Sequence, residues 1–369
     1  MKSKLVFVIG QLSIGGSENY LVNLVSGLNK NKFDIEVICL SDKLELEGKF
    51  AEHGYTVHVI NPKFLRKFTT IIHLRSIINS IKPDIVHTIG RSWYYAIPAS
   101  IGIKSKIVIS SQSIPPWKGR AYKFLDKLLF KNISLCLANA DRVKQATWTD
   151  LGMPPNICSV IYTGLNIDKF DSNLQKDILN PPHSVISQIN SKPVLVVVAR
   201  LQPVKSIHTI ITALKGIHVF HPNAQLWVIG AGPSEKKLKE LTLRLNITKQ
   251  VHFWGYRDDI PAILANSDIG VFSSNSEGLP TTITEYMAAK LPVISTNVGG
   301  ISEQIIDNVT GVFVPNNSAE DIVKATCSLL SDKKKMEQMG SKGRQVIEQK
   351  FSLSKMISEH ENTYHSLIL

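Results

Sequence analysis

The chain has 369 residues and a mass of 41.0 kDa, which is more than one hydrophobic core usually supports, so two domains are expected. Hydrophobic residues make up 43% and charged residues 20%, as in soluble globular proteins. The sequence has no apolar run near the roughly 20 residues of a transmembrane helix, and the run from Leu5 to Gly10 is too short for a signal-peptide core. We therefore expect a cytoplasmic protein, with four reduced core thiols at Cys39, Cys136, Cys158 and Cys327.

The formal net charge of +12 is concentrated in the first half of the chain. Residues 1–170 hold 22 basic and 12 acidic residues, and the segment 61–132 holds 13 basic and two acidic ones. An anionic partner is therefore expected to meet the first half. Nucleic acid is disfavoured as that partner, because the charge lacks interleaved aromatic residues and no binding motif is present.

Short apolar runs alternate with helix-length segments along the whole chain. The first half contains six predicted strands, at residues 5–10, 35–40, 56–60, 84–89, 107–111 and 134–139. After a polar, proline-bearing stretch the pattern restarts, with predicted strands at 194–201, 226–232, 251–255, 269–274, 292–296 and 311–315. Near-continuous apolar strands that alternate with helices indicate parallel sheets covered on both faces.

This pattern predicts an α/β protein with two doubly wound, Rossmann-like domains. The first domain is expected to cover residues 1–171 and the second residues 193–345, joined by a linker over 172–192. The segment 346–369 is helical in period with a bend near Phe351. Two such sheets facing each other place a ligand crevice at the carboxyl edges of their strands.

Two adjacent glycines precede the first predicted helix. Gly15 and Gly16 lie in the loop GQLSIGGSEN, directly after the first strand. A helix start without side chains lets a ligand approach backbone N–H groups. A plain strand-to-helix turn is the alternative.

A pair of cations follows the first strand of the second domain. Arg200 ends the strand that begins at Val194, and Lys205 comes five residues later. A guanidinium fork and an ammonium group at one strand end are suited to clamping a diphosphate. Taken alone, the pair also fits an ordinary solvated surface.

The stretch GAGPSE at 230–235 imitates the dinucleotide fingerprint G-x-G-x-x-G, but Glu235 occupies the third glycine position. A structural turn explains it equally well. The first half also fails the spacing, although Asp42 follows the second strand, where a dehydrogenase keeps its ribose ligand. An NAD-dependent oxidoreductase is therefore only a minor hypothesis.

Two glutamates eight positions apart bracket a Gly-Leu-Pro turn. In SSNSEGLPTTITEYMAAK (273–290) these are Glu277 and Glu285. A helix that begins near Pro280 would point the unpaired N–H groups of residues 279–282 toward a phosphate. The carboxylates can then bind separate sets of hydroxyls, as in a sugar ring and a ribose. Alternatively, Glu285 is only a first-turn carboxylate that favours the helix dipole.

In order and spacing, seven motifs of the second half resemble the donor half of the retaining glycosyltransferases of family 4, which have the GT-B fold. The motifs are ARLxxxK, VIGAGP, VHFWGYRDDI, ANSDIGVFSS, SEGLPTTITEYMA, PVISTNVGGISE and TGVFVP. GGSE and VIYTG extend the likeness across most of the chain. The family signature, Glu followed by seven residues and Glu, matches Glu277 and Glu285.

The resemblance implies a role for each candidate residue. Arg200 and Lys205 would neutralise the donor diphosphate, with Gly15 and Gly16 on its other side. Glu277, which with Arg200 and Lys205 makes up the implied catalytic set, would bind the donor sugar hydroxyls. The remaining donor contacts would be Glu285 to the ribose, Tyr256 and Arg257 to the base, and Gly278, Leu279, Pro280, Thr281 and Thr282 to sugar and phosphate.

The resemblance also implies front-face attack with retention, in which Arg200 and Lys205 stabilise the leaving diphosphate without a covalent nucleophile, a metal ion or a separate cofactor. One departure concerns the acceptor side. Many relatives carry His-x-His after the fourth strand, whereas here the run is His87-Thr88-Ile89. We retain two interpretations of His87, an acceptor-side residue or a core histidine.

Two basic segments of the first half are helical in period. A helix would align Arg120, Lys123, Lys127 and Lys131 in one stripe, and residues 63–82 are also basic. Basic amphipathic helices suit an anionic membrane surface, whereas packing against the first sheet is the alternative. The resemblance agrees with peripheral membrane attachment, and it implies that the final helix crosses back to the first domain.

We therefore predict a retaining hexosyltransferase of polysaccharide biosynthesis. It would use a nucleotide-diphosphate sugar and a lipid-linked or cell-surface glycan acceptor. The alternative is a non-catalytic sugar-nucleotide or glycan-binding protein of the same fold. The presence of all four of Arg200, Lys205, Glu277 and Glu285 argues against that alternative.

Overall fold

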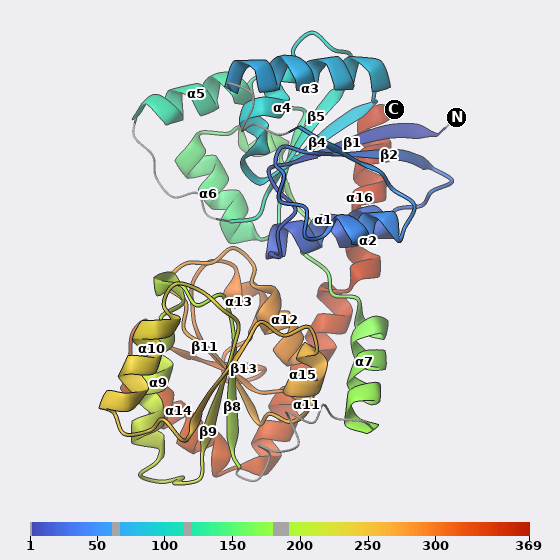
Figure 1. The fold of residues 1–369 in the computed structure, drawn as a ribbon. Helices are drawn as coiled ribbons and strands as arrows, with labels where there is room; N and C mark the ends of the chain where they lie inside the picture. The colour runs from blue at the N-terminus through green and yellow to red at the C-terminus, as the bar shows by residue number, and fades with distance from the viewer. Residues whose placement is uncertain (1, 61–66, 114–119, 180–191) are drawn as a thin grey trace. The chain divides into compact units, whose positions relative to one another are not determined.

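The computed structural model describes residues 2–60, 67–113, 120–179 and 192–369. The chain divides into two compact units (Figure 1). Unit 1 comprises residues 1–164 and 353–369, and unit 2 comprises residues 165–352. Each unit contains one parallel sheet with helices on both faces, as predicted.

Unit 1 contains a seven-stranded sheet in the order β3-β2-β1-β4-β5-β6-β7. Its strands are β1 (Ser3–Ile9), β2 (Phe33–Cys39), β3 (Val57–Val59), β4 (Ile85–Ile89), β5 (Lys106–Ser111), β6 (Leu135–Ala138) and β7 (Cys158–Val160). All neighbouring strands are parallel. The six predicted strands are confirmed. Sequence reasoning missed β7, whose three residues include an exposed serine, Ser159, and do not form a continuous apolar run.

The alternating side chains of β1 pack against different helices of unit 1. The helices and 3-10 turns of unit 1 are α1 (Gly16–Gly27), α2 (Glu47–Ala51), α3 (Lys67–Ile81), η1 (Gly90–Ser92), α4 (Trp93–Ser100), α5 (Arg120–Phe130), α6 (Asp141–Leu151), η2 (Pro155–Ile157) and α16 (Leu353–Ile368). Leu5 and Phe7 of β1 contribute to a core with α1, α2 and α16, whereas Val6 and Val8 pack with α3 and α4.

Unit 2 contains a six-stranded parallel sheet in the order β10-β9-β8-β11-β12-β13. Its strands are β8 (Val194–Val198), β9 (Gln225–Ile229), β10 (Val251–Gly255), β11 (Ile269–Phe272), β12 (Val293–Thr296) and β13 (Gly311–Val314). All six strands predicted for the second half are present. β8, β9, β11 and β13 end one to three residues earlier than predicted, because the loops at the carboxyl edge of the sheet begin sooner.

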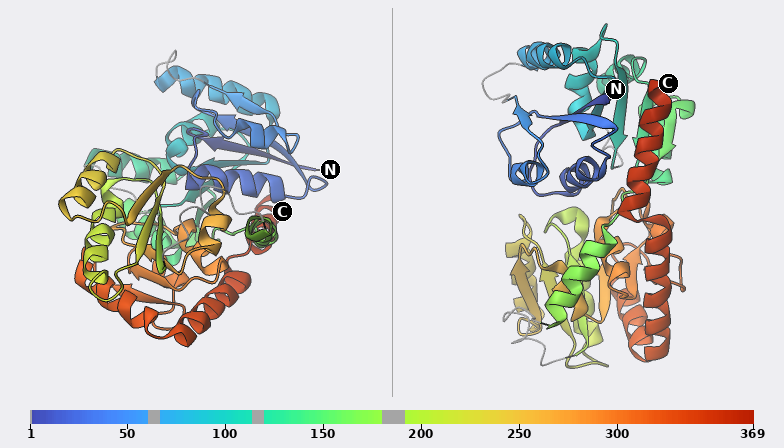
Figure 2. Two further views of the ribbon diagram at one scale, coloured as in Figure 1. Left: turned by 60° about the horizontal axis from the view of Figure 1, so that its bottom comes forward. Right: turned by 90° about the vertical axis from the view of Figure 1, so that its right-hand side faces the viewer.

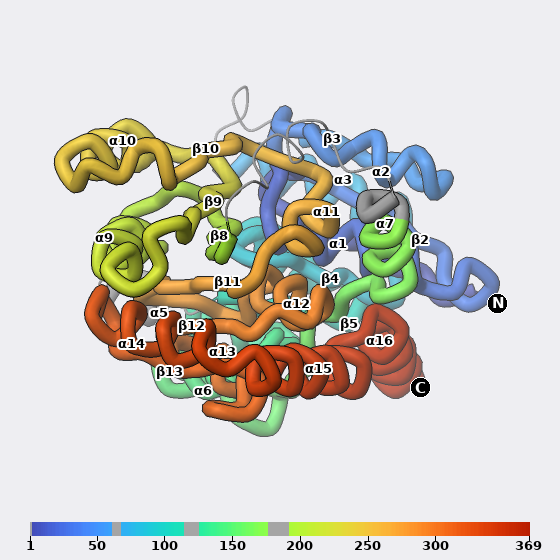
Figure 3. Tube along the Cα trace, turned by 90° about the horizontal axis from the view of Figure 1, so that it is seen from below, coloured from blue at the N-terminus to red at the C-terminus, as the bar shows by residue number. Residues whose placement is uncertain are grey.

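Helices cover both faces of this sheet. The helices and the 3-10 turn of unit 2 are α7 (Ile167–Leu179), η3 (Pro203–Lys205), α9 (Ile207–Ile217), α10 (Glu235–Arg244), α11 (Ile260–Ala265), α12 (Thr281–Ala288), α13 (Ile301–Gln304), α14 (Ala319–Leu330) and α15 (Lys333–Lys350). As Figure 3 shows, α9, α10 and α14 lie on one face and α11 and α12 on the other. Leu195, Val197 and Val228 form the core under α9 and α14.

The unit boundaries differ from the expected domain limits. Residues 172–179 continue α7, which packs on α11 in unit 2, and the rest of the expected linker, 180–191, lies outside the described residues. The helical segment at the end of the chain breaks between Lys350 and Leu353, as the predicted bend required. As Figure 2 shows, α16 (red) runs along unit 1, where Met356 and Tyr364 enter the core, whereas α15 belongs to unit 2.

Within the described ranges, no helix is both long and apolar enough to cross a membrane.

Candidate functional site

The sheet of unit 2 opens at the point where its strand order reverses. β8 pairs with β9 over all of Val194–Val198, but it pairs with β11 only at Leu195 and Val196. In a doubly wound sheet, ligands bind at the carboxyl ends of the strands that flank such a reversal. The ends of β8 and β11 therefore define the candidate site.

Lys205 and Glu277 meet at this opening. Lys205 lies in the turn after β8, Glu277 follows β11, and the ammonium group donates a hydrogen bond to the carboxylate. The side chains are only 18% and 11% exposed, so the ion pair is partly desolvated. The Lys205 ammonium also lies 5.3 Å from the centre of the Phe272 ring. Arg200 is exposed to solvent after the end of β8.

Hydrogen bonds between the two loops hold this ion pair in place. Ser273 donates to the carbonyl oxygens of Lys205 and Ser206, each at 3.0 Å. The side-chain amide of Asn275 donates to the Ser206 hydroxyl at 2.8 Å. The polar residues just before Glu277 therefore position the loop that carries Lys205.

Two glycines allow close backbone approaches beside the opening. Gly230 has a φ of 122°, and a Cβ there would be 2.0 Å from the Ala199 carbonyl oxygen. Gly299 has a φ of 60°, and its Cβ would be 2.2 Å from the Glu277 carbonyl oxygen. Both positions therefore require glycine. The glycines of the GAG motif let the loop after β9 pack against the loop after β8. This favours the structural turn over a dinucleotide-binding fingerprint.

The helix between the two glutamates begins where the sequence predicts. α12 starts at Thr281, directly after Pro280, so its first N–H groups have no partner within the helix. Leu279 is buried, and Thr282 is half-buried. Gln304, which sequence reasoning missed, fixes this helix start. Its amide nitrogen donates to the Pro280 carbonyl oxygen at 3.1 Å and to the hydroxyl of a threonine in the first turn, Thr284, at 2.8 Å.

Glu285 lies in the second turn of α12 and is half-buried. Burial raises the pKa of its carboxyl group to about 7. In the part of the chain that the structure describes, no group makes a hydrogen bond or ion pair with this carboxylate. A first-turn interaction with the helix dipole is therefore not its role. A desolvated carboxylate without a protein partner favours hydroxyl donors from a ligand.

The loop after β10 contains a closed ion pair. The Arg257 Nε donates to Asp259 Oδ1 at 2.7 Å, and the guanidinium lies 5.7 Å from the centre of the Trp254 ring. Tyr256 is 60% exposed, and Asp258 is also exposed. Asp259 is thus engaged by its neighbour, which leaves Tyr256 and Asp258 as the accessible side chains of this loop.

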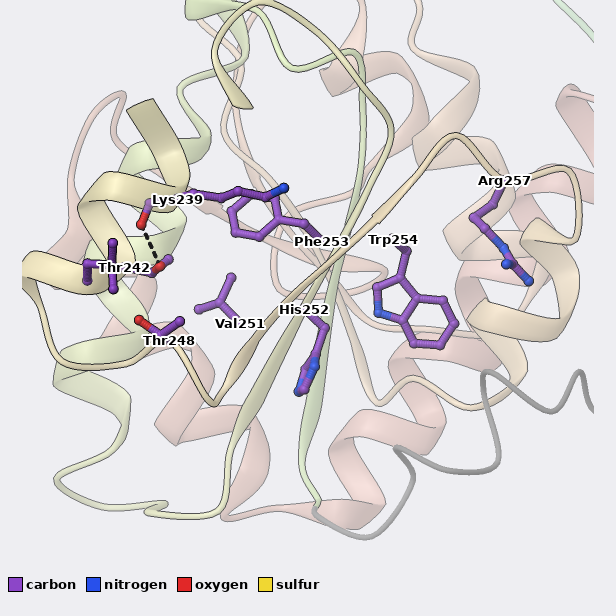
Figure 4. A pocket seen from close by; sticks show the side chains of 9 residues that line it. Lys239, Thr242, Thr248, Val251, His252, Phe253, Trp254 and Arg257 are labelled. Carbon is purple, nitrogen blue, oxygen red and sulfur yellow. Dashed lines mark hydrogen bonds between the residues drawn. The ribbon is translucent and has the colours of Figure 1, made fainter. Parts of the chain in front are cut away.

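A cavity of about 510 Å³ runs along the edge strand β10. As Figure 4 shows, Lys239 lies against Phe253 on the α10 side of the strand, with the ammonium 5.4 Å from the ring centre. Of the predicted site residues, only Arg257 lines this cavity. Its other lining residues are Lys239, Thr242, Leu243, Thr248, Val251, His252, Phe253 and Trp254.

In unit 1, Gly15 and Gly16 lie at the start of α1, beside the β1–β4 reversal of strand order. Gly15 has an extended backbone, and a Cβ there would be 2.4 Å from a Glu18 carboxylate oxygen. Gly16 is exposed, and a Cβ there would have no atom within 4 Å. Space thus remains over the backbone at Gly16, as an approaching ligand requires.

His87 lies in the interior of unit 1. Its Nδ1 is 2.7 Å from the Tyr364 hydroxyl, and its Nε2 is 2.7 Å from the Ser110 hydroxyl. Burial and the nearby His360 hold the pKa of His87 well below its usual range. Both ring nitrogens are therefore occupied within the core, which favours the core interpretation of this histidine.

No group of three or more His, Cys, Asp or Glu side chains that could hold a metal ion occurs among the described residues.

The architecture and the location of the site define a class of protein. Two doubly wound parallel sheets in series, with polar loops at the reversal of strand order in each, constitute the GT-B fold. A solved structure of the Anabaena protein HepE, in complex with UDP and glucose, covers 99% of this chain and 100% of its own at a TM-score of 0.86 and 19% identity. Figure 1 shows both sheets of this fold in our structure.

Family models account for both halves of the chain. The model of the group 1 glycosyl transferases matches residues 183–346, and the model of glycosyltransferase family 4 matches residues 14–169. The chain belongs to this family of glycosyltransferases.

Two curated relatives align over nearly their whole length. An uncharacterized glycosyltransferase of Haemophilus influenzae is 23% identical over 97% of this chain and 99% of its own. The UDP-Gal:α-D-GlcNAc-diphosphoundecaprenol α-1,3-galactosyltransferase of Escherichia coli is 25% identical over 93% of this chain and 91% of its own.

Proposed function

We propose that the protein is a retaining hexosyltransferase that uses a nucleotide-diphosphate sugar and needs no metal ion. The observation that carries this proposal is the constellation at the opening of the unit 2 sheet. Arg200 and Lys205 follow β8, and Glu277 follows β11, which is the neighbour of β8 in the sheet. Cations and a carboxylate at this edge suit a donor that combines a diphosphate with a sugar.

The ion pair between Lys205 and Glu277 gives a simple model of donor binding. When a diphosphate enters, it competes for the Lys205 ammonium, and Arg200 is free to join it. The Glu277 carboxylate is then released to accept hydrogen bonds from the sugar hydroxyls. The unpaired N–H groups of Thr281 and Thr282 favour the developing negative charge.

In this mechanism the leaving group is the nucleoside diphosphate. The bond between the anomeric carbon and the phosphate oxygen breaks as the acceptor hydroxyl attacks from the same side of the sugar. The departing phosphate takes up the proton of that hydroxyl. Arg200 and Lys205 stabilise the charge that grows on the leaving oxygen, so that no covalent intermediate with the protein is needed. Glu285 binds the ribose hydroxyls, and Tyr256 covers the base.

For the acceptor we propose a lipid-linked glycan. The name of the Escherichia coli relative gives a sugar on diphosphoundecaprenol as its acceptor, which supports this class. The relative has UDP-galactose as its donor, and HepE was solved with UDP and glucose, which makes uridine nucleotides the first donors to test.

The test of this function is a transfer assay with UDP- and GDP-hexoses and a short-chain polyprenyl-diphosphate sugar. We expect product with one donor, and the anomeric proton coupling in its NMR spectrum should show retention. Glu277→Ala should abolish product formation. A wild-type protein that binds the donor but transfers no sugar to any acceptor would favour the alternative, a non-catalytic sugar-nucleotide-binding protein.

We further propose that unit 1 attaches to an anionic membrane surface. On α5, Leu125 and Leu128 are 40% and 52% exposed and lie near the exposed Lys127. Lys131, the last cation of the predicted stripe, is also exposed but directly follows the helix, which ends at Phe130. Exposed leucines among lysines suit a bilayer that contains acidic lipids. The side chains of Arg120 and Lys123, and the segments 61–66 and 114–119, lie outside the described residues.

Vesicle sedimentation tests this attachment. The protein should sediment with phosphatidylglycerol vesicles and remain in solution with phosphatidylcholine vesicles. Leu125→Glu combined with Leu128→Glu should abolish sedimentation. Leu243→Glu, at an exposed leucine of α10 in unit 2, is the matched control and should sediment as the wild type does. Equal sedimentation of all three proteins would refute the proposed surface.

A further inference from the structure

The carboxyl-terminal end of β8 lacks a strand partner on its β11 side. β11 pairs with β8 only as far as Val196, so Val198 faces the opening. Buried backbone groups need hydrogen-bond partners. Two side chains of α12 supply them. The Val198 N–H donates to the Tyr286 hydroxyl at 2.8 Å, and the Thr282 hydroxyl donates to the Val198 carbonyl oxygen at 3.2 Å.

Tyr286 fills the gap between the two strands. Its side chain is fully buried, and its hydroxyl also donates to the Val196 carbonyl oxygen at 3.3 Å. Its ring lies against Gly270 of β11, where a Cβ would be 2.4 Å from a ring carbon. The absence of a side chain at Gly270 therefore makes room for the ring. The hydroxyl can bind β8 only while the ring occupies this space.

Both contacts come from one face of α12. Thr282 and Tyr286 are four residues apart, so they lie above each other on the helix. Their hydrogen bonds to Val198 fix the position of α12 along β8 and the rotation of α12 about its own axis. Arg200 follows Val198 by two residues, and Glu285 directly precedes Tyr286. The position of Arg200, after β8, relative to Glu285, on α12, therefore depends on these two hydrogen bonds.

We infer that Tyr286 and Thr282 are positioning residues, which hold the start of α12 at the distance from Arg200 that a donor diphosphate requires. This inference rests on the proposed function. Neither residue needs to touch the donor through its side chain. Each acts through the backbone of Val198. A shift of α12 would move the N–H groups of its first turn away from the phosphate that Arg200 binds.

Tyr286→Phe tests this inference, because it keeps the ring against Gly270 and removes only the hydroxyl. We expect the Kd for UDP to rise about tenfold and the Kd for UMP by less than about threefold, measured by calorimetry. GDP and GMP replace them if the wild type binds guanosine nucleotides. If the hydroxyl had only a structural role, its loss would raise the Kd values for UDP and UMP by the same factor, because UDP differs from UMP only in its second phosphate.

Tyr364→Phe is the matched control in unit 1. It also removes a buried hydroxyl, which binds His87 at 2.7 Å, and it should leave both Kd values within about twofold of the wild type. If Tyr286→Phe does not fold, Thr282→Val tests the second bond from a side chain that is only half-buried. Thr282→Ser keeps the hydroxyl and should restore the affinity for UDP.

Two results with the variants would overturn the inference while the proposed function stands. Wild-type affinity for UDP in both Tyr286→Phe and Thr282→Val would show that these hydrogen bonds do not set the site. A loss of affinity that is equal for UDP and UMP would show a general structural effect. If the wild-type protein itself binds neither UDP nor GDP, the proposed function fails, and this inference fails with it. The wild-type measurement thus separates the two failures.

Discussion

Arg344 and Asp171 form a two-pronged ion pair that joins α15 to α7 in unit 2. Nη1 and Nη2 of the guanidinium each lie 2.7 Å from a different carboxylate oxygen. Arg344 also donates to the Ala288 carbonyl oxygen at the end of α12. One side chain thus connects the helix that carries Glu285 with the two helices beside it.

Removing this ion pair should destabilise unit 2 modestly. Asp171→Asn keeps the shape and removes the charge, and we expect a loss of about 1–2 kcal/mol in the free energy of unfolding. Urea unfolding measures this loss. Glu320→Gln removes an exposed ion pair with Lys324 and should leave the free energy of unfolding within experimental error of the wild type. Equal effects of the two substitutions would contradict the structural role of the Arg344 pair.

Two glycines of α15 should respond to alanine in opposite ways. A Cβ on Gly340 would be 1.9 Å from the Lys290 carbonyl oxygen, whereas a Cβ on Gly343 would make ordinary contact with Met287 at 3.5 Å. Gly340→Ala should therefore cost about 2–4 kcal/mol. Gly343→Ala should be neutral or stabilise by up to about 1 kcal/mol, because alanine favours the helix. Thermal unfolding of both variants checks the difference.

Glu285 should make donor binding dependent on pH. Its folded pKa of about 7 lies above that of an unfolded glutamate, so the folded state retains a proton between about pH 4.5 and 7, and the contribution of this carboxyl group to stability is lost as the pH rises through this range. Ribose hydroxyls favour the ionised form. Donor affinity should thus rise from pH 6 to pH 8, with release of a proton.

Calorimetry in two buffers of different ionisation enthalpy measures that proton. Glu285→Gln should remove the proton release and flatten the pH dependence of stability. Glu240→Gln, at an exposed position of α10, should change neither. Proton release that persists in Glu285→Gln would assign the titration to another group.

The buried histidines of unit 1 should make it sensitive to acid. Burial lowers the pKa of His360 to about 4 and holds that of His87 well below its usual range. The groups that face His360 and His87 are the hydroxyls of Tyr20, Tyr364 and Ser110 and the Met356 carbonyl oxygen. The unfolded chain binds protons at these two histidines below about pH 6.5 that the folded chain excludes, so their contribution should lower the stability as the pH drops from 7 to 4.

Urea midpoints at pH 7.5 and pH 5.0 measure this acid sensitivity. His360→Gln should reduce the difference between the two midpoints, because it removes one of the two excluded protons. His365→Gln, on the exposed face of the same helix, should leave the difference unchanged. An equal response of both variants would contradict the role of the buried pair.

Much of the fold could be predicted from the sequence, because strands such as Val194–Val198 are continuous apolar runs bounded by polar loops. The start of α12 was also predictable, since Pro280 favours a first helical turn. The short strand β7 and the extension of α7 past residue 172 were not. They depend on partners such as β6 and α11, which are distant in the sequence.

The candidate site was predictable where a charge marks the end of a strand, as at Arg200 and Lys205. Sequence alone could not reveal that Lys205 pairs with Glu277, because the two residues lie 72 positions apart. Nor could it reveal that Tyr286 replaces a strand partner of β8. In the sequence Tyr286 is indistinguishable from an ordinary core residue. Its role follows only from the structure, in which β11 pairs with β8 no further than Val196.

In the proposed function, unit 2 binds a nucleotide-diphosphate sugar through Arg200, Lys205 and Glu277. The most direct measurement is a thermal-shift screen of the full chain against UDP, GDP, ADP and their hexose conjugates, because a ligand of the folded state raises the melting temperature. We predict that one nucleotide series raises the Tm of the wild type and that Arg200→Ala loses most of this rise. An equal rise in Arg200→Ala, or no rise in the wild type with any nucleotide, would rule out this donor site.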